Sequence, residues 1–135
     1  MELVIGAGEW AAGVLRIIIG PLFAIHGYPK FIDLKGTKKF VKSVGFPLPG
    51  FFAFMTASTE FVGGLAILAG FATRLACILL MINMMVAFYF NSVVWKKNFI
   101  SGYELDLVLL AGLVALFLLG AGVASADSMF GWFLG

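Results

Sequence analysis

Charged and amide side chains interrupt long apolar stretches of this sequence, and they are the residues that could do chemistry. Glu60, Arg16 and Asn83 each lie inside a run of mostly hydrophobic residues. If such a run crosses a membrane, a charge within it costs at least ~2.5 kcal/mol on insertion scales, so it needs a partner or a function. A buried carboxyl group can exchange protons, and a guanidinium can neutralise it. Glu60 and Arg16 are therefore the first candidate catalytic residues.

Small residues accompany both of these charges at helical spacing. One helical face carries Ala53, Ala57, Glu60 and Gly64, and a similar stripe near Arg16 carries Gly13, Gly20, Ala24 and Gly27. Stripes of this kind let membrane helices approach closely. If the two helices run antiparallel, the sequence predicts an ion pair between Arg16 and Glu60. That pair has two interpretations, a proton-handling site or a buried lock that only sets helix register.

Further polar groups are candidates for binding or proton transfer. Asn83, Ala87 and Asn91 share one helical face, and Glu104 opens another inward-facing stripe that continues through Val108, Ala111 and Ala115. Glu104 is a candidate catalytic residue, although acids at the start of a helix also simply stabilise it. His26 is the sole histidine. It is either a hydrogen-bonded structural residue or a ligand-binding one.

Several cofactor chemistries are excluded by residue counts. Cys77 is the only cysteine, so the chain has no Cys-x-x-Cys pair and no thiolate cluster. One histidine cannot supply both axial ligands of a bis-histidine haem. No flavin-binding fingerprint occurs either. The sequence therefore predicts no metal site and no haem, flavin or iron–sulfur cluster within this chain.

The elements that must position these residues are membrane-spanning helices. Of the 135 residues, 62% are hydrophobic and only 12% are charged. Four apolar stretches reach the length of about 20 residues that a spanning helix needs, at residues 11–29, 50–70, 74–94 and 104–122. The first lacks a preceding basic segment, so it is interpreted as a retained helix rather than a cleaved signal. The expected fold is all-α, an integral membrane four-helix bundle forming a single domain over residues 1–135.

The connection between the first two spans is basic and amphipathic. Lys35, Lys38, Lys39 and Lys42 lie on one helical face, opposite Phe40, Val41 and Val44. This pattern predicts a short helix in the membrane interface, with an ordinary basic loop as the alternative. Together with Lys96 and Lys97, these lysines place both loops in the cytoplasm and both termini outside the cell membrane. The lipid bilayer is the expected partner, and nucleic acid is not.

Short motifs along most of the chain resemble those of the DoxX family. They are Leu15-Arg16, His26-Gly27, Lys30-Phe31, Glu60-Phe-Val-Gly63-Gly64, Gly70-Phe-Ala-Thr73-Arg74, Gly102-Tyr103-Glu104 and Ser125-Ala126-Asp127. The resemblance covers roughly residues 10–130 and departs from the family pattern at Ala121. It implies a four-helix membrane protein that in some members is the membrane subunit of a quinone-reducing complex, such as thiosulfate:quinone oxidoreductase.

The resemblance leads to two functional hypotheses. In the first, a quinone binds within the bundle near Arg16, His26, Glu60 and Asn83, while Glu60 or Glu104 passes protons and a soluble or membrane redox partner protein supplies electrons. In the second, the chain is a non-redox scaffold or small-molecule transport protein with a polar intramembrane cavity. A transporter of only four helices would need an oligomer. The small-residue stripes leave a homodimer open.

Overall fold

The chain folds into helices joined by short turns. The computed structural model describes the backbone of residues 2–131 and the side chains from Gly6 onward. Within that range no β-strand occurs. The elements in chain order are α1 Glu2–Ile32, α2 Leu34–Ser43, α3 Pro49–Ala69, α4 Thr73–Tyr89, η1 Phe90–Val94, η2 Phe99–Tyr103, α5 Glu104–Leu119 and α6 Ala126–Phe130. Four segments are long and apolar enough to cross a membrane, namely Gly6–Ile32, Pro49–Ala69, Thr73–Val94 and Phe99–Leu119. The predicted all-α membrane fold is confirmed.

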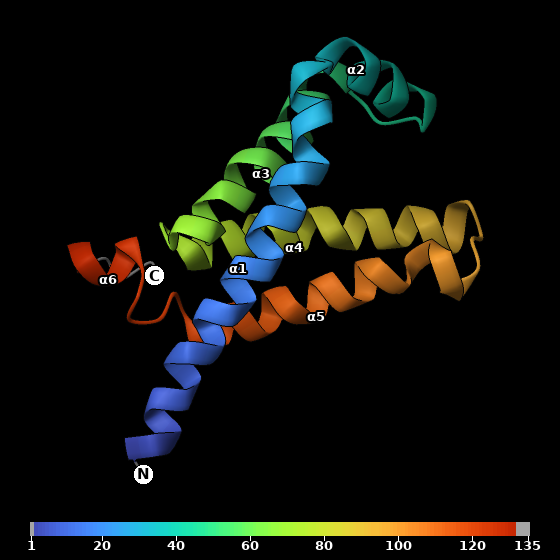
Figure 1. The fold of residues 1–135 in the computed structure, drawn as a ribbon. Coiled ribbons are helices and arrows are strands. Elements are labelled where there is room, and N and C mark those ends of the chain that lie inside the picture. The colour runs from blue at the N-terminus through green and yellow to red at the C-terminus, as the bar shows by residue number, and fades with distance from the viewer. Residues whose placement is uncertain (1, 132–135) are drawn as a thin grey trace.

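The four long helices form two antiparallel pairs that cross at a wide angle. Helices α1 and α3 lie side by side, and α4 and α5 form the second pair (Figure 1). Helix α2 lies at one end of the first pair, and α6 lies near the opposite end. The two pairs meet near the middle of α1 and diverge toward α2 on one side and the η1–η2 turn on the other.

Small residues bring the backbones of α1 and α3 into direct contact. A Cβ atom added at Gly20 would lie 2.8 Å from the amide nitrogen of Leu68, and one added at Gly27 would lie 2.7 Å from the carbonyl carbon of Glu60. Gly64 packs equally closely on the α1 backbone at Ala24. From Gly20 to Gly27 on α1 and at Gly64 on α3, the predicted stripes are therefore the surfaces that pack, because only small residues permit such an approach. Gly13, the first member of the α1 stripe, has no such neighbour.

The prediction that the last span carries an inward-facing stripe from Glu104 through Val108, Ala111 and Ala115 is wrong. Val108 is 67% exposed and Ala111 is also exposed, whereas Leu109, Leu113 and Leu116 are buried. Helix α5 packs against α4 and α1. Large leucine side chains, rather than a small-residue stripe, fill the space between these helices.

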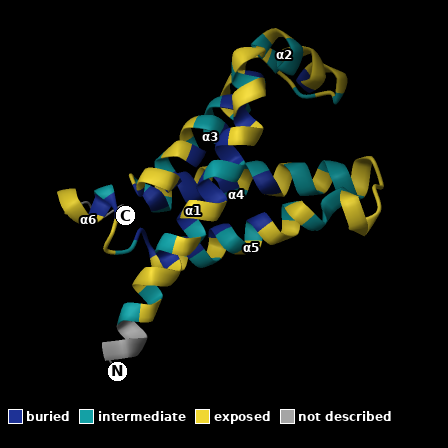
Figure 2. Cartoon of the chain, viewed as in Figure 1, coloured by how far each residue is buried: buried dark blue, intermediate teal, exposed yellow. Residues whose placement is uncertain are grey.

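The outer faces of the long helices are apolar, as a lipid environment requires. Ile17, Ile25 and Leu118 are 67%, 69% and 72% exposed. Figure 2 shows exposed residues along every long helix, with the buried ones concentrated where the two pairs cross. Exposed side chains of this kind would be costly in water, so the fold is that of a membrane protein.

Helix α2 is the predicted amphipathic helix. It begins after Asp33, whose side chain accepts a hydrogen bond from the Gly36 amide, and it buries Val41. Lys35, Lys38, Lys39 and Lys42 are all exposed. The helix thus presents a basic face away from the protein and an apolar face toward α3.

Candidate functional site

A cavity of about 840 Å³ lies where the two helix pairs diverge, between the end of α1, α2, α3, α4 and η1. Its lining is mostly apolar and includes the aromatic residues Phe40, Phe46, Phe51, Phe52, Phe90 and Trp95. Its polar lining includes Lys30, Thr56, Glu60, Asn83 and Asn91. An apolar cavity of this size with a few convergent polar groups is the usual form of a small-molecule site.

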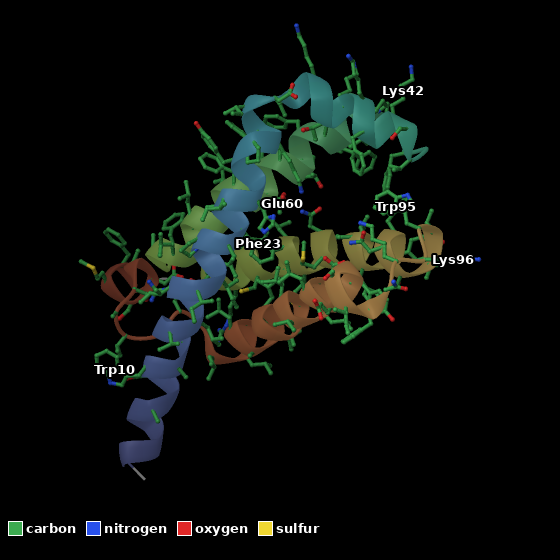
Figure 3. The ribbon with its side chains drawn as sticks, turned by 45° about the vertical axis from the view of Figure 1, so that its right-hand side comes forward. Trp10, Phe23, Lys42, Glu60, Trp95 and Lys96 are labelled. Carbon is green, nitrogen blue, oxygen red and sulfur yellow. The ribbon has the colours of Figure 1, made fainter. Side chains whose placement is uncertain are left out.

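Glu60 and Lys30 form an ion pair in the cavity wall. Lys30 Nζ lies 2.6 Å from Glu60 Oε2 and 2.7 Å from Oε1. The Glu60 side chain is only 5% exposed, whereas that of Lys30 is 41% exposed. Figure 3 shows Glu60 in the space between the α1–α3 pair and α4. The carboxylate is therefore enclosed by protein, and the ammonium group is its more accessible partner.

Two further side chains fix the position of this carboxylate. Asn83 Nδ2 on α4 donates a hydrogen bond of 2.9 Å to Glu60 Oε1. Thr56 Oγ1 on α3 in turn donates a bond of 2.6 Å to Asn83 Oδ1. The chain of bonds links both helix pairs across the cavity and holds the Asn83 amide in one orientation.

Asn91 marks a second polar position, further along the same face as Asn83. Its Nδ2 donates a hydrogen bond of 2.7 Å to Asp106 Oδ2 on α5. Its Oδ1 is buried and has no hydrogen-bond partner. Asn91 belongs to η1, a short π-helical segment at the end of α4, and such segments are frequent at functional sites.

Aromatic rings join α2 to η1 at the edge of the cavity. The rings of Phe40 and Trp95 lie 5.9 Å apart, those of Phe90 and Trp95 lie 5.6 Å apart, and those of Phe46 and Phe90 lie 5.5 Å apart. Pairs at these distances are favourable aromatic contacts. The four rings form an apolar wall between the amphipathic helix and the end of α4.

The predicted ion pair between Arg16 and Glu60 is wrong. The guanidinium of Arg16 donates to the carbonyl oxygens of Ile67, Leu68, Ala121 and Ala124, at 2.8 to 3.0 Å. The backbone of α1 lies closest to Glu60 at Gly27. Since Arg16 precedes Gly27 by about three helical turns, the register carries it to the far end of α3 instead. Arg16 therefore connects the end of α3 to the segment that follows α5.

Asp127 completes this connection around Arg16. Its carboxylate accepts hydrogen bonds from the amides of Ala72 and Thr73, at 2.7 and 3.0 Å, and from the Thr73 hydroxyl at 3.0 Å. It thereby caps the start of α4, where no local side chain does so. Both Arg16 and Asp127 are buried. Their contacts are with the protein's own backbone and with Thr73.

The other predicted site residues lie apart from the cavity lining. His26 is exposed on α1. Glu104 accepts a hydrogen bond of 2.9 Å from the Ser101 amide at the start of α5. Of the four residues predicted to bind a ligand, Glu60 and Asn83 are brought together and Arg16 and His26 are not. Among the described residues, no group of three His, Cys, Asp or Glu side chains could hold a metal ion.

The sequence pattern did not identify Lys30 as the partner of Glu60. The predicted first span ends at residue 29, but α1 continues through Pro29 to Ile32. The small-residue stripe that passes through Ala24 and Gly27 reaches Lys30 in one further step of three residues. Extending the stripe by that step would have identified the lysine that faces Glu60.

Comparison with known proteins identifies related chains along most of the sequence. CatD of Bacillus subtilis strain 168, which is named provisionally as an oxidoreductase, is 34% identical over 84% of this chain and 82% of its own. The inner membrane protein YqjF of Escherichia coli K12 is 32% identical, with 86% and 88% covered. An uncharacterized protein of Haemophilus influenzae is 30% identical, with 86% and 87% covered. No solved structure matches significantly. Residues 11–92 match the DoxX family, and the chain therefore belongs to the DoxX family of membrane proteins.

Proposed function

We propose that this protein is the membrane subunit of a quinone-linked oxidoreductase system and that it binds a quinone or quinol in the cavity between α2, α3 and α4. The observation that carries the proposal is the Lys30–Glu60 ion pair in the wall of a mostly apolar cavity. A lipid-soluble quinone needs an apolar space for its ring and substituents and polar groups for its two oxygens. The provisional oxidoreductase name of CatD supports the same class of function.

In this proposal the chain's own side chains bind the ring and exchange protons. Reduction of a quinone adds two electrons and two protons and yields a hydroquinone. The electrons come from a reduced soluble or membrane redox partner protein. Lys30 Nζ donates a hydrogen bond to one ring carbonyl oxygen. During reduction Glu60 takes up a proton from water and passes it to the ring, and water supplies the second proton; oxidation of the hydroquinone returns both by the same routes. Asn83 keeps the carboxylate in position for this exchange.

The proposed orientation follows from the charge distribution. The lysines of α2 and the pair Lys96 and Lys97 lie at exposed positions. Because cytoplasmic loops of membrane proteins carry an excess of Lys and Arg, these lysines support a cytoplasmic position for both turns. A soluble redox partner would then meet the protein on the side where the cavity lies next to α2 and η1.

A second candidate function is a non-redox scaffold or transport of a small molecule. The same cavity and ion pair favour it, because they would also accept another molecule with an apolar body and a polar end. The two functions differ in what stabilises the protein. A quinone would stabilise the protein only in the quinone-linked function. Transport of a small molecule into vesicles would identify the second function.

The test is quinone titration of the purified protein in mild detergent, with intrinsic fluorescence and thermal unfolding as readouts. Glu60→Gln keeps the size of the side chain and removes its charge, and Glu9→Gln is the matched control at an exposed position of α1. We expect saturable binding and a raised unfolding temperature in the parent and in Glu9→Gln, with binding weakened about tenfold in Glu60→Gln. Absence of saturable binding in the folded parent would reject the quinone proposal.

A further inference from the structure

The cavity has an apolar edge made of residues that are exposed at the surface of the protein. Helices α3 and α4 diverge from the turn that joins them, and the cavity lies between them (Figure 1). Its lining residues at this edge are 38% to 56% exposed, whereas the Glu60 side chain in the same cavity is only 5% exposed. The exposed edge consists of Phe51 and Met55 on α3 and of Leu79, Ile82 and Val86 on α4.

On α4 this edge continues directly into the outer surface of the helix. Ile82 lies about 100° around the helix from Asn83, and the buried Met84 lies about 100° from Asn83 in the opposite direction. Ile82 is therefore on the side of α4 that faces away from the core. Ile78 and Met85 follow beyond it around the helix, and both are exposed without lining the cavity. The cavity wall and the outer apolar face of α4 thus form one continuous surface.

The exposed edge lies at the depth of lipid acyl chains. Met55 is about 9 Å along α3 from Pro49, where its membrane span begins. Ile82 is about 18 Å along the chain from Val94, where its own span ends. The hydrocarbon core of a bilayer is about 30 Å thick, so both residues lie within it rather than among the headgroups. A molecule dissolved in the membrane can therefore reach the cavity without passing through water.

The polarity of the lining changes from the exposed edge to the interior. None of the five side chains at the edge carries an N–H or O–H group. Further in, Thr56, Asn83 and Glu60 form a chain of hydrogen bonds, and Lys30 pairs with Glu60. This gradient matches a molecule with a polar head and a hydrocarbon chain, because the head can reach the ion pair while the chain stays at the apolar edge.

We infer that the cavity opens between α3 and α4 into the hydrocarbon core of the membrane, and that its ligand is a long-chain amphiphile whose chain lies against Met55 and Ile82. This inference rests on the proposed function, and it names the substrate class as quinones that reside in the membrane and carry a hydrocarbon tail. The ring enters from the bilayer and reaches Lys30 and Glu60. The tail remains in the lateral opening, as we call the edge formed by the five exposed lining residues.

The test measures equilibrium binding of two quinones with the same ring, one with a methyl group and one with a polyisoprenoid tail, to the full chain in lipid nanodiscs. The variant carries Met55→Trp and Ile82→Trp, which fill the lateral opening with larger side chains. The matched control carries Met85→Trp and Ile78→Trp, the same two exchanges at exposed positions that do not line the cavity. Calorimetry reports binding, because added tryptophans alter intrinsic fluorescence. Thermal unfolding verifies that each protein is folded.

We expect the tailed quinone to bind the variant about tenfold more weakly than it binds the control, because the tryptophan rings take the place of the tail. The methyl quinone should bind variant and control within about twofold of each other, since its ring contacts only the distant ion pair. Each quinone partitions into the same membrane in both samples, so partitioning does not affect these ratios. If the double variant does not fold, Ile82→Trp is compared with Ile78→Trp alone.

Two results would overturn the inference and leave the quinone site in place. One is equal binding of the tailed quinone by the folded variant and the control. The other is an equal loss of affinity for both quinones in the variant, since the tail would then have no separate position. If neither quinone binds the folded parent, the proposed function fails and the inference fails with it.

Discussion

Arg16 and Glu60 are both buried charges, but they serve opposite ends of the same helix pair. Glu60 has a charged partner in Lys30 and lies at a cavity. Arg16 is surrounded by four backbone carbonyl oxygens, two at the end of α3 and two in the segment that follows α5. Carbonyl groups at the end of a helix have no partners within the helix, so a guanidinium with five donors is well suited to satisfy several at once. Glu60 is a candidate for chemistry, and Arg16 holds the fold together.

Substitution of Arg16 tests this division. Arg16→Met should lower the free energy of unfolding by about 3 kcal/mol or more, because several buried carbonyl oxygens lose their donor. Arg74→Met is the control, since Arg74 donates one such bond, to Phe117, and the loss should be near 1 kcal/mol. Reversible unfolding in mixed detergent measures both. Adding Glu60→Leu to Arg16→Met should restore nothing; recovery in the double variant would mean that the two charges are paired after all.

At the level of single residues, the sequence drew attention to Glu60, Asn83 and Arg16 but paired Glu60 with Arg16, whereas the structure pairs it with Lys30. Spacing along one helix shows which residues share a face, and both Asn83 and Asn91 were placed correctly in this way. It does not show how far one helix is displaced along another. That displacement decided that Lys30, and not Arg16, meets Glu60, and it depends on the depth to which the glycines of α1 and α3 allow the helices to approach.

Among the elements, the α1–α3 contact has the greatest influence on the site, because it sets the height of Lys30 relative to Glu60. The contact is made through backbone atoms at Gly20, Gly27 and Gly64. A helix pair held this closely has one well-packed register. By contrast, α5 contributes mainly leucine side chains to the interior, and its first polar residue in contact with the cavity wall is Asp106.

The closeness of this pair leads to a prediction for Gly27. Gly27→Ala should destabilise the protein by about 1 to 3 kcal/mol, because the new methyl group would collide with the backbone at Glu60 and Phe61. Gly13→Ala lies on the same helix with no atom within 4 Å of the added methyl group, so it should be neutral or slightly stabilising. The thermal unfolding temperatures of the two variants measure this difference. Equal stability of both variants would show that α1 and α3 are not in backbone contact at Gly27.

The whole molecule is a pair of helical hairpins that meet at one place and leave a cavity at another. Composition and hydropathy were sufficient to predict four helices and the amphipathic helix α2, since each depends on residues near one another in sequence. The start of the first helix was not predicted, because α1 begins at Glu2 rather than at residue 11. The wide crossing of the two pairs was not predictable in the same way. It depends on contacts of α3 with α4 and of α1 with α5, which involve ordinary apolar side chains without a distinctive pattern.

The placement of the whole molecule in the bilayer is open to direct measurement. Cys77 is the only cysteine and is buried, so a single added cysteine reports its own location. Lys39→Cys on α2 and Ser128→Cys on α6 are both at exposed positions, and Figure 1 places these helices at opposite ends of the α1–α3 pair. A membrane-impermeant thiol reagent should label Lys39→Cys only from the cytoplasmic side and Ser128→Cys only from the other. Labelling of both from one side would contradict four membrane crossings.

The hydrogen bonds that Arg16 and Asp127 make also determine when the protein can finish folding. Ribosomes deliver the chain from its N-terminus, so α1, α3 and the start of α4 enter the membrane before Ala121, Ala124 and Asp127 exist. Until then Arg16 has only its acceptors on α3, and the first amides of α4 have no cap. The turn between α3 and α4 is thus secured by residues that follow α5. A chain that ends after α5 would lack the Asp127 cap on α4 and two of the four carbonyl acceptors of Arg16.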